Sequence, residues 1–131
     1  MAEKINDRLE WETYKETRIV CADCREMTTE DLVPQIRQNN KDLLQIGKKQ
    51  GKASLLFYID LTNAVISNEV MAAAKEDLAE LQPYLKAVAV AGITGVRRFL
   101  TDVVRKFTGN NMRGFPTEVE AKDWLVKEAR K

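Results

Sequence analysis

Four side chains that can donate or accept hydrogen bonds follow an apolar run in the middle of this chain: Asp60, Thr62, Asn63 and Ser67. The preceding run, 55–59, is rich in strand-forming residues and predicts a buried central strand. Ser67 has the residue type that begins helices, so the polar side chains fall at the carboxyl end of a strand. In open α/β sheets, ligands and partners bind at that edge. We call residues 60–67 the elbow and predict a recognition or switch site there.

The residue types in the elbow allow a functional and a structural interpretation. In the functional one, phosphorylation of Thr62 adds about −1.5 to −2 charges beside Asp60 and near a helix start. In the structural one, Asp60, Thr62 and Asn63 bond to nearby backbone in an ordinary turn, and Ser67 only caps the helix.

A second candidate site, for an anion or ligand, consists of Thr94, Gly95, Arg97 and Arg98. Residues 92–95 join an expected strand to an expected helix, and the backbone N–H groups of such a turn can bind an anion. The two arginines belong to a basic cluster that suits a phosphate, an acidic partner or an anionic lipid. The alternatives are a tight turn and a solvated helix face whose cations favour the helix carboxyl end.

The composition argues against an enzyme. The chain has no histidine, which excludes Ser-His-Asp and Cys-His arrangements. Cys21 and Cys24 have CxxC spacing, but they lie in an expected strand, where residues three apart face opposite sides. Zinc takes about four ligands, and there is no third cysteine. We therefore expect two buried thiols, no metal, no cofactor and no catalytic site.

Strand and helix patterns alternate along the chain in the order β-β-α-β-α-β-α-β-α. The expected strands cover residues 8–14, 18–25, the run that begins at residue 55, 87–93 and 112–115. The expected helices begin near residues 28, 67, 95 and 117, with glycines 47 and 51 at the exit of the first. The short link before residue 18 predicts an antiparallel hairpin.

This alternation predicts the α/β class, with a single domain over residues 1–131. We expect a mixed, mostly parallel sheet of four to five strands, entered by an antiparallel hairpin, and about four helices. The last helix places Val119, Trp124, Leu125 and Ala129 on its apolar side, and we expect it to bury Trp124 and Leu125.

Charge and hydropathy limit the classes of partner and the cellular location that we expect. The chain has 131 residues, a net charge of +1, and 44% hydrophobic and 31% charged residues. This balance creates no overall field for nucleic acid, so we expect none to bind. The longest nearly apolar run, 85–93, is too short to cross a bilayer, and the first residues lack the apolar stretch of a signal peptide. We expect a cytoplasmic protein.

Three segments resemble the STAS superfamily, and within it the SpoIIAA-like (STAS/Sec14-type) branch: residues 57–63, 85–95 and 115–125. The resemblance implies the same α/β fold. STAS regulators typically carry Asp-Ser-Ser-Gly at the elbow, with the second serine as phosphate acceptor. Asp60 matches the first position, and Thr62 keeps a hydroxyl at the acceptor position. Leu61 and Asn63 differ from the pattern.

Together these observations predict a non-enzymatic regulatory or protein-interaction module that recognises a protein partner through the elbow and is switched at Thr62. The alternative is a domain that binds or senses a small apolar or lipid-like ligand, as the Sec14-type resemblance implies. Its walls would be Val65, Ile66, Met71 and residues 96–99, with Arg97 or Arg98 at an anionic head group. A pocket of at least about 300 Å³ would favour this alternative. Homo-oligomerisation stays open.

Overall fold

The computed structural model of the chain describes residues 3–92, 105–106, 109 and 111–131. Within this part, six strands form one sheet in the spatial order β1-β2-β3-β4-β5-β6. The strands are β1 (Glu3–Asn6), β2 (Leu9–Tyr14), β3 (Thr17–Asp23), β4 (Leu55–Asp60), β5 (Leu85–Ala91) and β6 (Met112–Phe115). The first three strands pair antiparallel, and β3 to β6 pair parallel. The helices are α1 (Thr29–Gln50), α2 (Asn68–Leu81), the 3₁₀ turn η1 (Gln82–Tyr84) and α4 (Glu118–Ala129).

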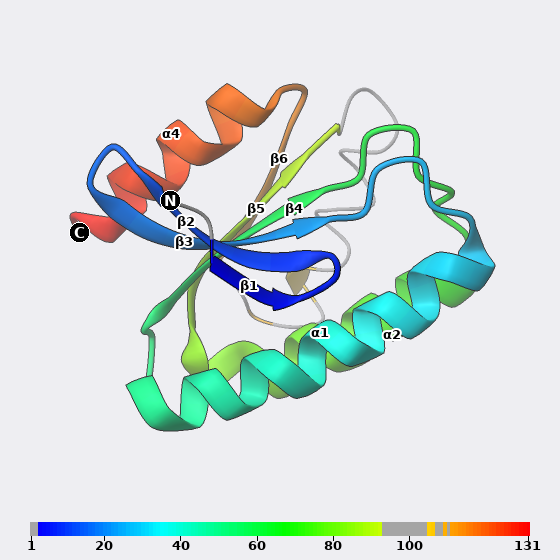
Figure 1. Cartoon of the computed structure of the whole chain (residues 1–131), viewed down its shortest axis with the longest axis horizontal. Coiled ribbons are helices and arrows are strands. Elements are labelled where there is room, and N and C mark those ends of the chain that lie inside the picture. The colour runs from blue at the N-terminus through cyan, green and yellow to red at the C-terminus, as the bar shows by residue number, and fades with distance from the viewer. Residues whose placement is uncertain (1–2, 93–104, 107–108, 110) are drawn as a thin grey trace.

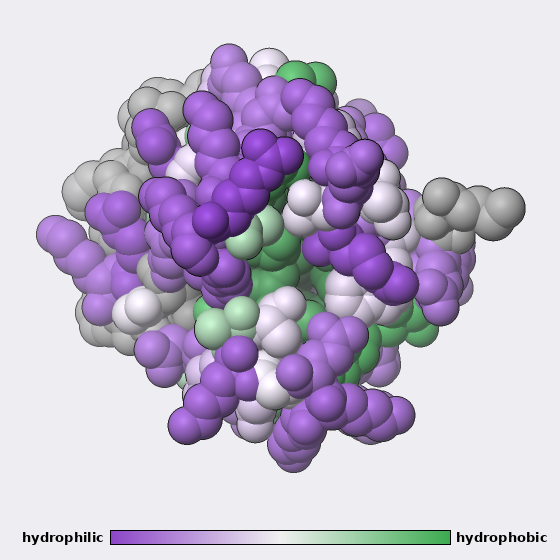
Figure 2. Space-filling view, turned by 90° about the vertical axis from the view of Figure 1, so that its left-hand side faces the viewer, coloured by the Kyte–Doolittle hydropathy of each residue, from purple (hydrophilic) through white to green (hydrophobic). Residues whose placement is uncertain are grey.

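The sheet is the middle layer of three. Figure 1 shows α1 and α2 side by side on one face and α4 on the opposite face. Side chains alternate between the faces along a strand, so Phe57 joins the core under α1 and α2, and Tyr58 joins the core under α4. Both faces of β4 are therefore buried, as expected of a central strand. On the face of the molecule in Figure 2, hydrophilic side chains surround a hollow in which apolar ones are visible.

The α/β class and the antiparallel entry are confirmed, but the expected count of four to five strands is wrong. The structure adds β1, which pairs antiparallel with β2 at the edge of the sheet. Its four residues are exposed or half-buried and include Lys4, so the strand lacks the alternation that indicates a buried face. A lysine on an edge strand also protects the edge from pairing with other chains.

The three helix starts follow the predicted caps. The side-chain oxygens of Thr28, Ser67 and Thr117 each accept a hydrogen bond from a backbone N–H three residues later. The first helix runs past Gly47 and ends at the Gly51 cap. Gly47 lies within this helix, and only glycine fits there because a Cβ would lie 2.6 Å from Cγ of Tyr84. The helix predicted from residue 95 lies mostly outside the described residues.

The last helix differs from its prediction at one end. Leu125 is fully buried as expected, and Trp124 is half-buried against Phe115, with ring centroids 5.6 Å apart. Val119 is 60% exposed, so placing it on the apolar side was wrong. The buried stripe instead consists of Ala121, Lys122, Leu125, Val126 and Glu128. None of the helices in the described ranges is long and apolar enough to cross a membrane.

Candidate functional site

The elbow begins at the last residue of β4 and folds back on that residue. The backbone N–H and the hydroxyl of Thr62 both donate to Oδ1 of Asp60, over 3.0 and 2.6 Å. Asn63 adopts a left-handed backbone with φ of 59°, which asparagine tolerates better than most residues. Ser67 caps α2 and accepts a hydrogen bond from the hydroxyl of Thr29 over 2.9 Å. The turn chemistry of the structural interpretation is thus present.

Backbone hydrogen bonds hold the elbow to the segments on either side. Its carbonyl and N–H groups bond to the loop after β3 and to the end of β5. The four bonds run from Cys24 N to Asp60 O (3.0 Å), Glu26 N to Thr62 O (2.9 Å), Val65 N to Met27 O (2.9 Å) and Leu61 N to Ala91 O (3.1 Å). Because these groups are fixed by main-chain bonds, the elbow is a preformed surface.

Gly92 allows the closest of these approaches. It follows β5 with φ of +82°, and a Cβ placed there would lie 2.7 Å from Cα, N and Oγ1 of Thr62. Two of those atoms belong to the main chain, so they cannot move without displacing the backbone of the elbow. The position of Thr62 therefore depends on a glycine at the end of the neighbouring strand.

The outer side of the elbow faces solvent. Thr62 and Asn63 are exposed. Val65 is 48% exposed and is one of two large apolar side chains that are exposed to solvent among the described residues. Ala64 beside it is buried and anchors the loop in the core under α1 and α2. The elbow thus presents two hydrogen-bonding side chains and one apolar side chain on a fixed backbone.

A polar groove of about 360 Å³ lies on the α4 face of the sheet and begins at Asp60. The hydroxyl of Tyr58 donates to Oδ2 of Asp60 over 3.2 Å, which connects the elbow to the groove floor. Farther along, the ammonium of Lys122 donates to both carboxylate oxygens of Glu12, over 3.0 and 2.8 Å, and to Glu118. Sequence reasoning missed this groove because its residues come from five separate elements.

The groove contains an ionised lysine that is almost completely buried. Lys122 is 4% exposed, and its ammonium lies 5.0 Å from the ring centroid of Tyr58. Burial opposes its charge, but the hydrogen bonds to Glu118 and Glu12 outweigh burial and raise its pKa. Burial raises the pKa of Tyr58 as well, with Asp60 adding to the effect. Tyr58 therefore stays protonated and continues to donate to Asp60.

The two cysteines pack on opposite sides of the sheet, as predicted, although β3 ends at Asp23 and Cys24 follows it and is not part of the strand. Cys21 packs in the core under α4, and Cys24 packs in the core under α1 and α2. Both thiols are free and buried. Burial raises the pKa of Cys24 to about 12 and raises that of Cys21 as well. A raised thiol pKa is the reverse of what a redox nucleophile needs.

The burial of the thiols predicts slow chemistry in the native protein. At mildly alkaline pH, we expect Ellman's reagent to modify Cys21 and Cys24 at least about a hundredfold more slowly than free thiols. After unfolding in guanidinium, both should react at once, and the single variants Cys21→Ser and Cys24→Ser should each lose one equivalent. Fast modification of either thiol in the native protein would contradict this account.

The second candidate site falls outside the described residues, since Thr94, Gly95, Arg97 and Arg98 all belong to the segment 93–104. Of the rest of the basic cluster, Arg105, Lys106 and Arg113 are exposed. The guanidinium of Arg113 lies 5.4 Å from the ring centroid of Phe115. The anion or ligand site at residues 94–98 stays a prediction.

An apolar cavity of about 90 Å³ lies between α1, α2 and the sheet. Ile66 and Met71, two expected walls of an apolar ligand site, line it, but the exposed Val65 does not. Ligand pockets usually measure about 300–1,000 Å³, so the cavity formed by the described residues is small for a lipid. The other expected wall, residues 96–99, lies outside the described residues, and a lipid-like ligand stays a prediction.

The described part of the chain contains no group of three or more histidine, cysteine, aspartate or glutamate residues able to hold a metal ion. Thr62, Asn63 and the groove offer hydrogen bonds and charge, and Tyr58 adds an aromatic ring to the groove. These groups suit recognition of a polar partner.

Comparison with known proteins identifies the fold. A solved structure from Shewanella loihica PV-4, an uncharacterized protein from the DUF3478 family with a SpoIIAA-like fold, superposes with a TM-score of 0.70. The match has 19% sequence identity and covers 93% of this chain and 98% of that one. No protein-family model and no curated protein matches the chain. The chain therefore has the SpoIIAA-like fold, as the sequence resemblance implied.

Proposed function

We propose that this protein is a non-enzymatic, cytoplasmic regulatory module with a SpoIIAA-like fold, which recognises a protein partner through the elbow. One observation carries the proposal. The exposed residues Thr62, Asn63 and Val65 stand on a backbone held by hydrogen bonds from both neighbouring segments. A preformed surface loses little conformational freedom when a partner binds, and this lowers the cost of association.

The surroundings of the elbow fit recognition better than catalysis. Asp60 belongs to both the elbow and the polar groove, so a partner seated on the elbow can extend a polar side chain along the groove. The side chains that could act as nucleophile or base are in unreactive states. Burial keeps both thiols protonated, and the ammonium of Lys122 is paired with two carboxylates. These features support a module that binds without transforming its partner.

We further propose that Thr62 is the switch and acts through charge. Its hydroxyl is bound to a carboxylate oxygen of Asp60 and lies close to Gly92. Phosphorylation would replace that hydrogen bond with a contact between two anions. At an interface, like charges brought together cost several kcal/mol unless a cation pairs with them. The phosphorylated elbow would therefore release a partner selected for a neutral threonine.

Affinity capture from the source cell tests the proposal. The tagged wild-type chain should retain a specific protein, and Thr62→Glu and Val65→Glu should each reduce its recovery at least about tenfold. The matched control is Gln45→Glu, which adds the same charge at an exposed position of α1. If all four chains capture the same proteins equally, or if none is captured specifically, elbow recognition is wrong.

A further inference from the structure

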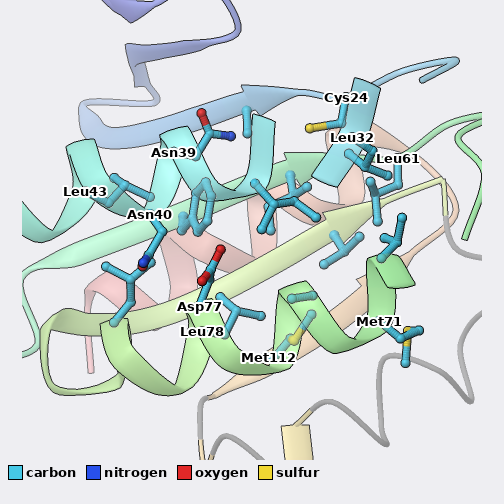
Figure 3. A pocket seen from close by; sticks show the side chains of 18 of the residues that line it. Cys24, Leu32, Asn39, Asn40, Leu43, Leu61, Met71, Asp77, Leu78 and Met112 are labelled. Atoms are coloured by element: carbon cyan, nitrogen blue, oxygen red, sulfur yellow. The ribbon is translucent and has the colours of Figure 1, made fainter. Parts of the chain in front are cut away.

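The apolar cavity between α1, α2 and the sheet contains two hydrogen-bond acceptors that have no partner in the described part of the chain. Asn40 and Asp77 are 9% and 6% exposed, and both line the cavity. Oδ1 of Asn40 and Oδ2 of Asp77 are buried and have no hydrogen-bond partner among the described residues. Leaving such groups unpaired costs about 1–3 kcal/mol each. The remaining lining is mostly apolar, which makes this polar end distinct (Figure 3).

The other atoms of these two side chains fix their orientation. Nδ2 of Asn40 donates to Glu80 over 2.6 Å, so its oxygen is the atom left over. Oδ1 of Asp77 accepts from Arg37 over 2.7 Å, which leaves Oδ2. The two bonds link α1 to α2 at positions three residues apart on each helix, so they are adjacent. Figure 3 shows Asn40 reaching from α1 and Asp77 from α2.

We propose that this cavity binds a small primary amine with an apolar body, whose ammonium group donates to Asn40 Oδ1 and Asp77 Oδ2. A hydroxyl group has one proton and can donate to only one of the two oxygens, whereas an ammonium group has three. Burial raises the pKa of Asp77, because a buried carboxylate loses its hydration, and Arg37 offsets this cost only in part. A cation beside the second oxygen would stabilise the charged carboxylate further.

The apolar body of the ligand would lie along the sheet. Leu43, Phe57 and Val90 line this part of the cavity, and Leu61 and Ile66, the inner residues of the elbow, also belong to its lining. At about 90 Å³ the space suits a molecule somewhat smaller than benzene, since an apolar cavity of about 150 Å³ binds benzene. This site is separate from the outer surface of the elbow, so the inference does not depend on partner recognition.

Nuclear magnetic resonance titration of the full chain tests the inference with three ligands of similar length: n-propylamine, n-propanol and propionate. We expect n-propylamine to shift the methyl signals of Leu43 and Val90 saturably in the millimolar range. n-Propanol should bind at least about tenfold more weakly because it satisfies one acceptor, and propionate should not bind because it adds an anion beside Asp77.

Two variants localise the binding. Ala74→Leu fills the cavity from α2 and should abolish the shifts, while its matched control Ala72→Leu, at an exposed position of the same helix, should leave them unchanged. Asp77→Asn, verified as folded by its spectrum, should weaken amine binding at least about tenfold. The inference would be overturned by equal binding of amine and alcohol, or by unchanged binding in Ala74→Leu. It would also be overturned if no ligand gives a saturable shift, which would mean that only water binds the two oxygens.

Discussion

Replacing Gly92 with alanine is expected to destabilise the protein by about 2–5 kcal/mol, because the new methyl group meets both strain and collision. The backbone at Gly92 has φ of +82°, a conformation that L side chains rarely adopt. The added Cβ would also lie 2.7 Å from backbone atoms of Thr62. Since those atoms belong to the elbow, the substitution should displace the elbow as well as lower the free energy of unfolding. Urea denaturation measures the first effect, and amide chemical shifts of residues 60–65 measure the second.

Gly51→Ala is the matched control for this prediction. Gly51 also has a positive φ, of +100°, but nothing lies within 4 Å of a Cβ placed there. Its ψ of −177° lies in a region that is essentially restricted to glycine, so its alanine variant should lose about 1–3 kcal/mol from backbone strain but nothing from collision. If the two variants lose the same stability, or if the elbow shifts are unchanged in Gly92→Ala, the close packing of β5 on the elbow is wrong.

Replacing Lys122 with methionine is expected to cost about 2–3 kcal/mol of stability. Methionine fills similar space, but Glu12 and Glu118 lose their shared cation, and Glu12 is left beside the buried Cys21. Breaking a fully buried ion pair costs about 3–5 kcal/mol. The smaller figure applies because the side chains of Glu12 and Glu118 are 33% and 55% exposed and can turn toward water.

Two further variants isolate the ion cluster. Lys127→Met removes a lysine from the exposed side of the same helix, and we expect a change within about 0.5 kcal/mol. Adding Glu12→Met to Lys122→Met should recover most of the lost stability, because it removes the carboxylate that has lost its cation. Denaturant midpoints of the four proteins test this. A double variant less stable than Lys122→Met would mean that packing, and not charge, explains the loss.

Much of the fold follows from local sequence signals. The apolar run from residue 55 identified the central strand, and the caps at Thr28, Ser67 and Thr117 identified three helix starts. Both signals depend only on residues that are close in sequence, which explains why the sequence alone predicts these elements. The edge strand β1 was missed because a half-exposed strand carries no such pattern.

The candidate site was predictable only in part. The sequence placed Asp60, Thr62 and Asn63 at the end of β4, but their bonds to the segments after β3 and β5 depend on which strands are neighbours. The groove and the cavity were missed for the same reason. One local signal was present in each: Lys122 and Asp77 lie at buried positions of their helices, among apolar neighbours. A charged residue in an apolar stripe usually has a specific partner, which here is a contact between distant segments.

Photo-cross-linking in the source cell tests elbow recognition most directly. A photo-reactive phenylalanine analogue replaces Val65 in one protein and the exposed Gln45 of α1 in another. We predict that a protein partner cross-links to position 65 and not to position 45, and that Thr62→Glu abolishes the product. Equal cross-linking from both positions, no product from position 65, or a product that Thr62→Glu leaves unchanged would contradict a recognition surface at the elbow.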